Sequence, residues 1–276
     1  MAKQIRTSAN RSGRVRRIAF RVAIALVFLF LLLALLPAYP LIAINWLPDD
    51  VYLAVRTDLE AGDVVHRLHS LALAMIAWGM LMGILLQAHR PEHKVSPLLA
   101  SLAVPIAIAL SEMLAGTYTV SGTAPFFVLV LTVVVLHPAA REMVRPPRWN
   151  FPMLGLAAAA ALPWVAYAVG LGEAAHNAEP GFEVEHMTFV SALALLAVLW
   201  GAIGASNHSG WQYAAGASLV ATTCVGLQSI IFPAVLSGLS LPWAVAALAW
   251  CGAYGSAAVW RSRAYSAHKS GARSVS

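Results

Sequence analysis

The sequence has few charged residues, and this scarcity excludes most classes of soluble protein. Only 11% of its 276 residues are Asp, Glu, Lys or Arg, whereas 60% are hydrophobic. A chain with so little charge and a mean hydropathy of +0.73 cannot cover a soluble domain with polar side chains. The composition therefore predicts an all-α polytopic membrane protein.

The sequence also lacks several signatures of chemistry. Its 2 cysteines, Cys224 and Cys251, both lie in apolar stretches, so they are expected to pack in helices and to form no disulfide between outer loops. There is no P-loop, no Gly-rich dinucleotide-binding motif, no Cys-x-x-Cys-His motif and no serine nucleophile elbow. No lysine lies within an expected helix, which argues against a retinal Schiff base.

Apolar stretches of membrane-spanning length run along the whole chain. We expect eight transmembrane helices, at residues 18–44, 64–87, 97–115, 124–138, 151–171, 186–205, 212–236 and 241–260. A basic flank precedes the first stretch, as in a signal peptide. The apolar core that follows continues without a small-residue cleavage site, so we expect a retained anchor.

The distribution of charge predicts the orientation of these helices. All of the 18 lysines and arginines except Arg56 and Arg67 fall on one side of the expected membrane. All of the 12 acids fall on the other side except Glu92, Glu112 and Glu142. Basic residues near helix ends are retained in the cytoplasm. We therefore expect an integral protein of a bacterial-type plasma membrane with both termini cytoplasmic, and the net charge of +6 needs no nucleic-acid partner.

A weak internal repeat divides the chain into two halves. Residues 71–79 resemble residues 193–201, and both segments end in Trp-Gly. Residues 112–125 likewise correspond to 228–242, because an acid or amide is followed by a Ser-Gly pair and a proline. The halves are expected to be two tandem four-helix bundles, related as parallel repeats. The expected organisation is a basic tail at 1–17, a first bundle at 18–148, a second bundle at 149–260 and a basic tail at 261–276.

Each half carries an acid-x-x-His element at the outer start of its second helix. Asp63, His66 and Arg67 open one helix, and Glu183 and His186 open the other. Histidine just inside a membrane boundary is a suitable metal ligand, and two at equivalent places predict haem iron bound by His66 and His186. Arg67 could bind a haem propionate, pair with Asp63 or only extend to the membrane interface.

Two further residues are candidates for cofactor binding. His69 shares a helix face with His66, so both could bind metal, or both could be boundary residues. His186 could similarly cap its helix instead of binding metal. Glu112 lies in an apolar stretch, where a carboxylate is a functional candidate, although a hydrogen bond inside the protein would also account for it.

At these residues the chain resembles the heme A synthase family, whose members have two four-helix bundles with both termini inside. The family's acid-x-x-His-Arg element is matched by Asp63, His66 and Arg67, with aspartate in place of the usual glutamate. His186 corresponds to a haem ligand of the sixth helix. The resemblance implies oxidation of the haem O methyl group to formyl, with a resident haem b passing electrons. His66 would hold the substrate, and Asp63 or Glu183 would assist proton transfer.

The chain departs from that family in its partner ligands. Family members place a histidine early in the fourth and eighth helices, whereas residues 126–135 and 243–250 contain none. His137 lies at the opposite end of the fourth helix from His66. The alternative functions are a non-enzymatic haem-binding or electron-relay protein and a small-solute transporter.

The resemblance also implies certain partners. These are haem, haem O synthase or cytochrome oxidase assembly factors, and membrane lipids, whereas a homo-oligomer is left open.

Overall fold

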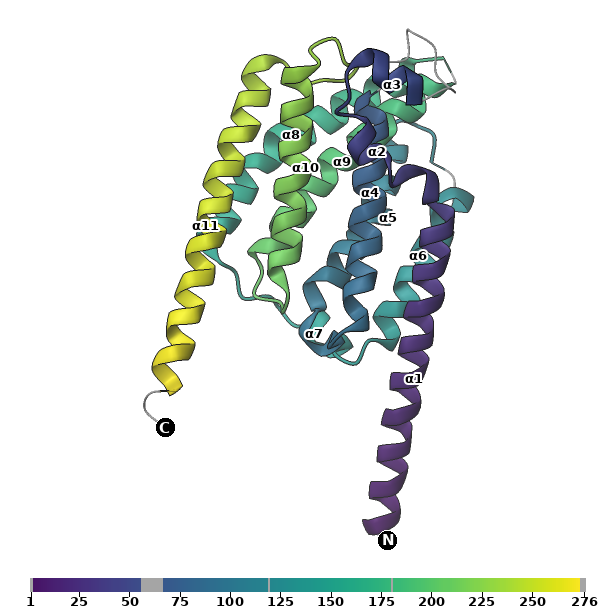
Figure 1. Cartoon of the computed structure of the whole chain (residues 1–276). Helices are drawn as coiled ribbons and strands as arrows, with labels where there is room; N and C mark the ends of the chain where they lie inside the picture. Colours follow the sequence, from purple (N-terminus) through teal and green to yellow (C-terminus); the bar gives the residue numbers. More distant parts are fainter. Residues whose placement is uncertain (1, 56–66, 119, 180, 274–276) are drawn as a thin grey trace.

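The computed structural model describes residues 2–55, 67–118, 120–179 and 181–273, and within these ranges every regular element is a helix (Figure 1). In chain order they are α1 (Ala2–Ala34), η1 (Leu36–Ala38), α2 (Leu41–Ile44), α3 (Asp49–Val55), α4 (Arg67–Leu85), η3 (Leu86–Ala88), η4 (Pro91–His93), α5 (Val95–Leu114), α6 (Val120–Leu136), α7 (Ala140–Met143), α8 (Phe151–Asn177), α9 (Phe182–Ala205), α10 (Trp211–Ile231) and α11 (Leu241–Arg273).

Among the described residues, 7 helices are long and apolar enough to cross a membrane. They are α1, α4, α5, α8, α9, α10 and α11. Helix α6 carries a shorter apolar stretch, Thr123–Leu136. The chain is therefore an all-α integral membrane protein, which confirms the class that the composition predicts.

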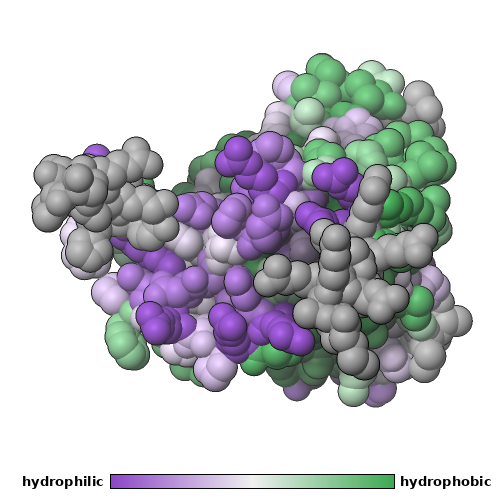
Figure 2. Space-filling model, turned by 90° about the horizontal axis from the view of Figure 1, so that it is seen from below, coloured by the Kyte–Doolittle hydropathy of each residue, from purple (hydrophilic) through white to green (hydrophobic). Residues whose placement is uncertain are grey.

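Both termini lie at the same end of the bundle (Figure 1). We call this the proximal end and the opposite one, where α2 and α3 lie, the distal end. Hydrophilic side chains gather over the centre of the proximal end, seen from below in Figure 2. Exposed arginines there include Arg90, Arg141 and Arg145. The polar cap and both ends of the chain therefore lie at the same end of the bundle (Figure 1 and Figure 2).

The helices pack as two sets that meet along α4, α5 and α9. In the first set α4 contacts α1 and α5, and α6 closes the ring by contacting α5 and α1. In the second set α9 contacts α8 and α10, and α11 contacts α10 and α8. Helices α4 and α9 are the most deeply buried of the candidate spans, and together with α5 they form the contact between the two sets.

Proline shortens two of the expected spans. Helix α1 ends at Ala34, ahead of Pro37 and Pro40, although its apolar stretch continues to residue 44. Helix α10 ends at Ile231, ahead of Pro233. Proline has no N–H to donate, and its ring collides with the preceding helical turn. After each helix the chain therefore turns across the distal end instead of lengthening the span.

Small side chains let the helices approach closely. In lipid, helices associate through close packing and hydrogen bonds, since lipid tails are as apolar as leucine. A Cβ atom on Gly204 of α9 would lie 2.8 Å from the Ala215 backbone of α10, closer than real contacts allow. Trp200, 1% exposed, links the two sets because its Nε1–H donates to the Ala100 carbonyl at 2.9 Å. The centre of the molecule thus depends on backbone proximity.

The basic ends are helical over much of their length. Helix α1 begins at Ala2 and helix α11 runs to Arg273, so the expected tails at 1–17 and 261–276 are largely helical. Arg261 donates hydrogen bonds to the Gly204 carbonyl at 2.9 Å and to the Ser206 carbonyl at 2.8 Å. A cation at the carboxyl end of α9 stabilises the partial negative charge of that helix end.

His137 is buried at the proximal end and does not approach the distal histidines. Its Nδ1 accepts the Ala139 N–H at 3.1 Å, so in the neutral ring Nε2 carries the proton and donates to Gln87 Oε1, also at 3.1 Å. Burial, together with the charge of Arg16, lowers the pKa of His137 to about 4. The imidazole is therefore neutral at physiological pH and acts as a structural hydrogen-bonding group.

The contact at Gly204 makes a testable prediction. Gly204→Ala should lower the thermal unfolding midpoint in detergent, because the added methyl group collides with the Ala215 backbone. Gly216→Ala on the neighbouring α10 is the matched control, since a Cβ there meets nothing within 4 Å. Alanine has the higher helix propensity by about 1 kcal/mol, so the control should be neutral or stabilising. Equal destabilisation by both changes would contradict the packing described here.

Candidate functional site

The predicted site residues that the structure describes all lie at the distal end (Figure 1). They are Arg67 and His69 at the start of α4, Glu112 near the end of α5, and Glu183 and His186 at the start of α9. The other two, Asp63 and His66, lie outside the described residues.

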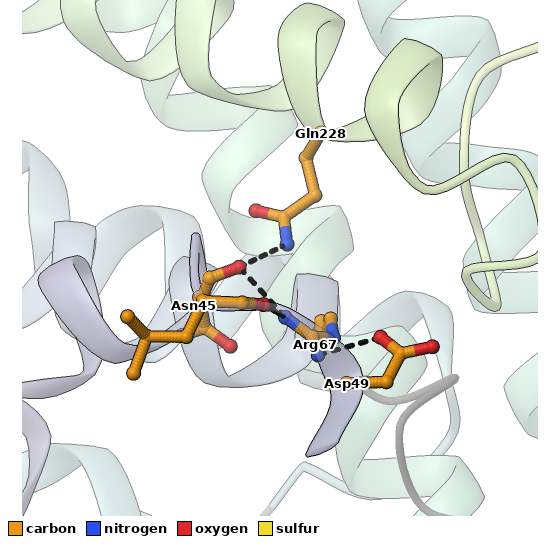
Figure 3. A network of polar contacts seen from close by, with 5 residues as sticks. Asn45, Asp49, Arg67 and Gln228 are labelled. Carbon is orange, nitrogen blue, oxygen red and sulfur yellow. Dashed lines mark hydrogen bonds and ion pairs between the residues drawn. The ribbon is translucent and has the colours of Figure 1, made fainter. Parts of the chain in front are cut away.

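Arg67 is a buried charge, 1% exposed, and its polar contacts are with residues 45–49, between α2 and α3 (Figure 3). Its Nη1 donates to the Leu47 carbonyl at 2.6 Å and to the Asn45 carbonyl at 3.2 Å. Its Nη2 pairs with Asp49 Oδ1 at 2.7 Å. Burying a charge is costly unless it is paired and hydrogen-bonded, and these contacts engage both Nη atoms, whereas Nε has no hydrogen-bond partner among the described residues. The guanidinium thus holds the start of α3 against α4.

Two aromatic rings add to the environment of this guanidinium. Arg67 Cζ lies 4.0 Å from the centroid of the Tyr52 ring of α3 and 4.4 Å from that of Phe232, which follows α10. A cation over a ring face is attracted by the ring quadrupole, more strongly when it is desolvated. Arg67 therefore joins α4, α3 and the distal end of α10.

Gln228 of α10 completes this network. It is fully buried, and its Nε2–H donates to the Asn45 carbonyl at 3.2 Å, the same oxygen that Arg67 contacts (Figure 3). The segment from α2 to α3, residues 41–55, is consequently fastened over the distal end of α10. The sequence predicts a propionate or Asp63 as the partner of Arg67. The anion that the structure places there is Asp49.

The structure brings His69 and His186 together. Their rings lie 5.6 Å apart between centroids with an interplanar angle of 25°, and both side chains are buried. The His186 Nε2 lies 3.2 Å from the Leu236 carbonyl and 3.1 Å from Ser237 Oγ. Because a carbonyl oxygen only accepts, Nε2 must carry a proton to bond to it. The pair lies where α4 meets α9, beside the turn that precedes α11.

The orientation of His186 bears on its predicted role as a haem ligand. An axial ligand must direct a ring nitrogen at iron in a cavity that admits the macrocycle. The Nε2 of His186 instead faces the 236–237 turn, and two large clefts of the molecule, one distal and one between α8 and α11, are lined by other residues. Within the described part of the chain, no three His, Cys, Asp or Glu side chains are grouped to hold a metal ion.

Glu112 lines a cleft of about 740 Å³ between α5, α8 and α9. Its Oε2 is inaccessible to solvent and has no hydrogen-bond partner among the described residues. Apolar walls are formed by Ile108, Val184 and Phe189, among others. An ionisable group at this depth in an apolar helix is expensive to bury and typically marks a solute or ion pathway. Glu112 is thus the predicted site residue that lines a cavity.

The polar lining of this cleft includes residues that sequence reasoning did not select. They are Thr117, His176, Glu185 and Thr188. His176 is exposed in the last turn of α8, which continues to Asn177, beyond its expected end at residue 171. Small residues near the end of α8 are compatible with such an extension, but their spacing carries no signal of a site. Glu183, a predicted catalytic residue, is exposed and lies next to the lining residue Val184.

Comparisons with protein families, curated proteins and solved structures find no match for this chain. The likeness to heme A synthase therefore rests on the short motifs of the sequence. The function proposed below is therefore based on the geometry of the distal end.

The Arg67 network makes a second prediction. Arg67→Ala should lower the free energy of unfolding by roughly 3 kcal/mol, because it leaves carbonyl groups and two rings without their buried partner. Asp49→Asn should cost less than about 1 kcal/mol, since the Asp49 side chain is 66% exposed. Chemical unfolding in detergent measures both changes. A loss for Asp49→Asn as large as that for Arg67→Ala would show that the ion pair, rather than the buried guanidinium, holds the α2–α3 segment.

Proposed function

We propose that the protein is a small-solute transporter with eight spans, and that its solute enters at the cleft beside Glu112. The single observation that carries the proposal is a carboxylate within an apolar helix, lining a cleft of about 740 Å³, with one oxygen unpartnered among the described residues. Carboxylates in such positions are typical of substrate and ion pathways.

The proposed architecture is two tandem four-helix bundles, α1–α4–α5–α6 and α8–α9–α10–α11. Helix contacts within each set follow the same cyclic order, which supports the repeat. The carbonyls of Gly79 and Gly201, which close the two Trp-Gly segments, both accept tyrosine hydroxyls, from Tyr213 and Tyr254. Helix α6 would be the eighth span, since its 17 residues extend about 26 Å, close to the hydrocarbon thickness.

The proposed orientation places the proximal end in the cytoplasm of a bacterial-type cell. Its support is the concentration of lysine and arginine at that end. The cleft beside Glu112 then opens on the outer face of the plasma membrane, where most of the acids lie.

Reporter fusions test this orientation. Fusions after Arg145 and at the C-terminus should behave as cytoplasmic, and a fusion after Glu179 should behave as external. A cytoplasmic signal at Glu179 would remove the outward cleft and the eight-span topology together.

Solute binding at the cleft is tested by thermal stabilisation of the purified, full-length protein in detergent. In a panel of amines, amino acids, sugars, carboxylates and nucleosides, at least one class should raise the unfolding midpoint, because a ligand bound only to the folded state stabilises it. Thr117→Trp, which fills the mouth of the cleft, should abolish the shift. The proposal fails if no class stabilises the protein, or if the shift is unchanged in Thr117→Trp.

A haem protein related to heme A synthase is the second candidate. The observation that favours it is the contact between His69 and His186, which brings the distal histidines of the two sets to within 5.6 Å. Haem ligation through the His186 Nε2 would require the 236–237 turn to release that atom. The oxidation of haem O, the resident haem b and assembly partners belong to this candidate.

An absorption spectrum of the protein purified from native membranes separates the two candidates. Our account predicts no Soret band, because the described histidines face each other and a turn. A b-type band that changes in His186→Ala, in protein that remains folded, would favour the haem candidate and contradict ours.

A further inference from the structure

The distal ends of α5 and α10 occupy corresponding places in the two helix sets but have different neighbours. Glu112 of α5 corresponds to Gln228 of α10 in the internal repeat. Gln228 is fully buried beneath residues 41–55, whereas Glu112 lines a cleft. Corresponding helix ends therefore have different surroundings: the end of α10 is covered by the chain, and the end of α5 faces a cavity.

At the covered position the chain supplies its own cation. The Arg67 guanidinium shares the Asn45 carbonyl with Gln228 and lies over the rings of Tyr52 and Phe232. Neutral Gln228 provides a hydrogen bond there, and Asp49 provides the negative charge. A guanidinium at this helix end is thus held by aromatic faces and one carboxylate.

At the cleft, the described lining residues supply negative charge and an aromatic ring. They include the carboxylates of Glu112 and Glu185 and the ring of Phe189, and no lysine or arginine is among the described residues of the lining. Within this described lining, His176 could carry a positive charge, and it is exposed. A carboxylate that lines a largely apolar cleft binds a charged donor more strongly than a neutral one.

We infer that the ligand of the cleft is a small organic cation, with a guanidinium or ammonium group that binds Glu112 and a short apolar part that packs on Phe189. This inference names the substrate class and rests on the proposed solute-binding function. The Glu112 carboxylate, which lines the cleft, would accept a charge-assisted hydrogen bond from the cationic group. The Phe189 ring would contact either the apolar part or the cation itself.

Four probes of similar size test the charge requirement: butylguanidinium, butylammonium, butyramide and butyrate. Titration calorimetry on the full chain in detergent should show binding of the two cations, with butyramide at least about tenfold weaker, as expected for the loss of a charged hydrogen bond. Glu112→Gln should weaken cation binding by about tenfold or more, and Glu112→Asp, which keeps the charge, should retain part of it. Glu173→Gln, an exposed distal acid outside the lining, is the matched control and should change affinity less than about twofold.

The outcomes separate this inference from the proposed function. The cationic class would be overturned if butyramide or butyrate bound as tightly as the cations, or if cation binding survived Glu112→Gln. Either result would still leave the proposed solute site, which Thr117→Trp blocks. Equal losses of cation affinity in Glu112→Gln and Glu173→Gln would mean that general surface charge attracts the cations, and this would overturn the assignment of Glu112 as the binding residue. If no probe binds and no compound of the panel shifts the unfolding midpoint, both the cationic class and the proposed solute-binding function are contradicted.

Discussion

The distal end depends on one buried charge, the guanidinium of Arg67. Desolvating a cation costs several kcal/mol, which its partners must offset. Those partners are two carbonyls, the Asp49 carboxylate and two aromatic rings, and they come from two separate segments of the chain, residues 45–52 and Phe232. The same contacts fasten residues 41–55 over α10.

This anchoring gives the two halves of the molecule different distal ends. The end of α10 is covered, and its Gln228 amide is used for structure. In the proposed repeat the end of α5 corresponds to it, and there the Glu112 carboxylate lines a cleft. In a medium of low dielectric constant such a group interacts strongly with whatever charge reaches it. We therefore propose that the distal end of α10 is structural and that the distal end of α5 binds the ligand.

The sequence predicts the spans well because membrane insertion depends on the length and apolarity of a segment, which are local properties. Glu112 could be selected for the same reason, as a charge inside an apolar stretch. The partner of Arg67 could not, because helical spacing points to Asp63 four positions earlier, whereas Pro37 and Pro40 fold a distant segment back over the helix. His176 was missed because its role depends on where the end of α8 lies against α5. The meeting of His69 and His186 follows from the packing of α4 on α9, which no local pattern encodes.

The most direct test of the account compares the two helix ends by cysteine accessibility. In a background with Cys224 and Cys251 replaced by serine, Glu112→Cys should react with a membrane-impermeant thiol reagent added from outside. Gln228→Cys should be protected, and adding Arg67→Ala should expose it. Equal reactivity at the two positions, or protection of Gln228→Cys that survives Arg67→Ala, would contradict the claim that the buried arginine closes one end and leaves the other open to a ligand.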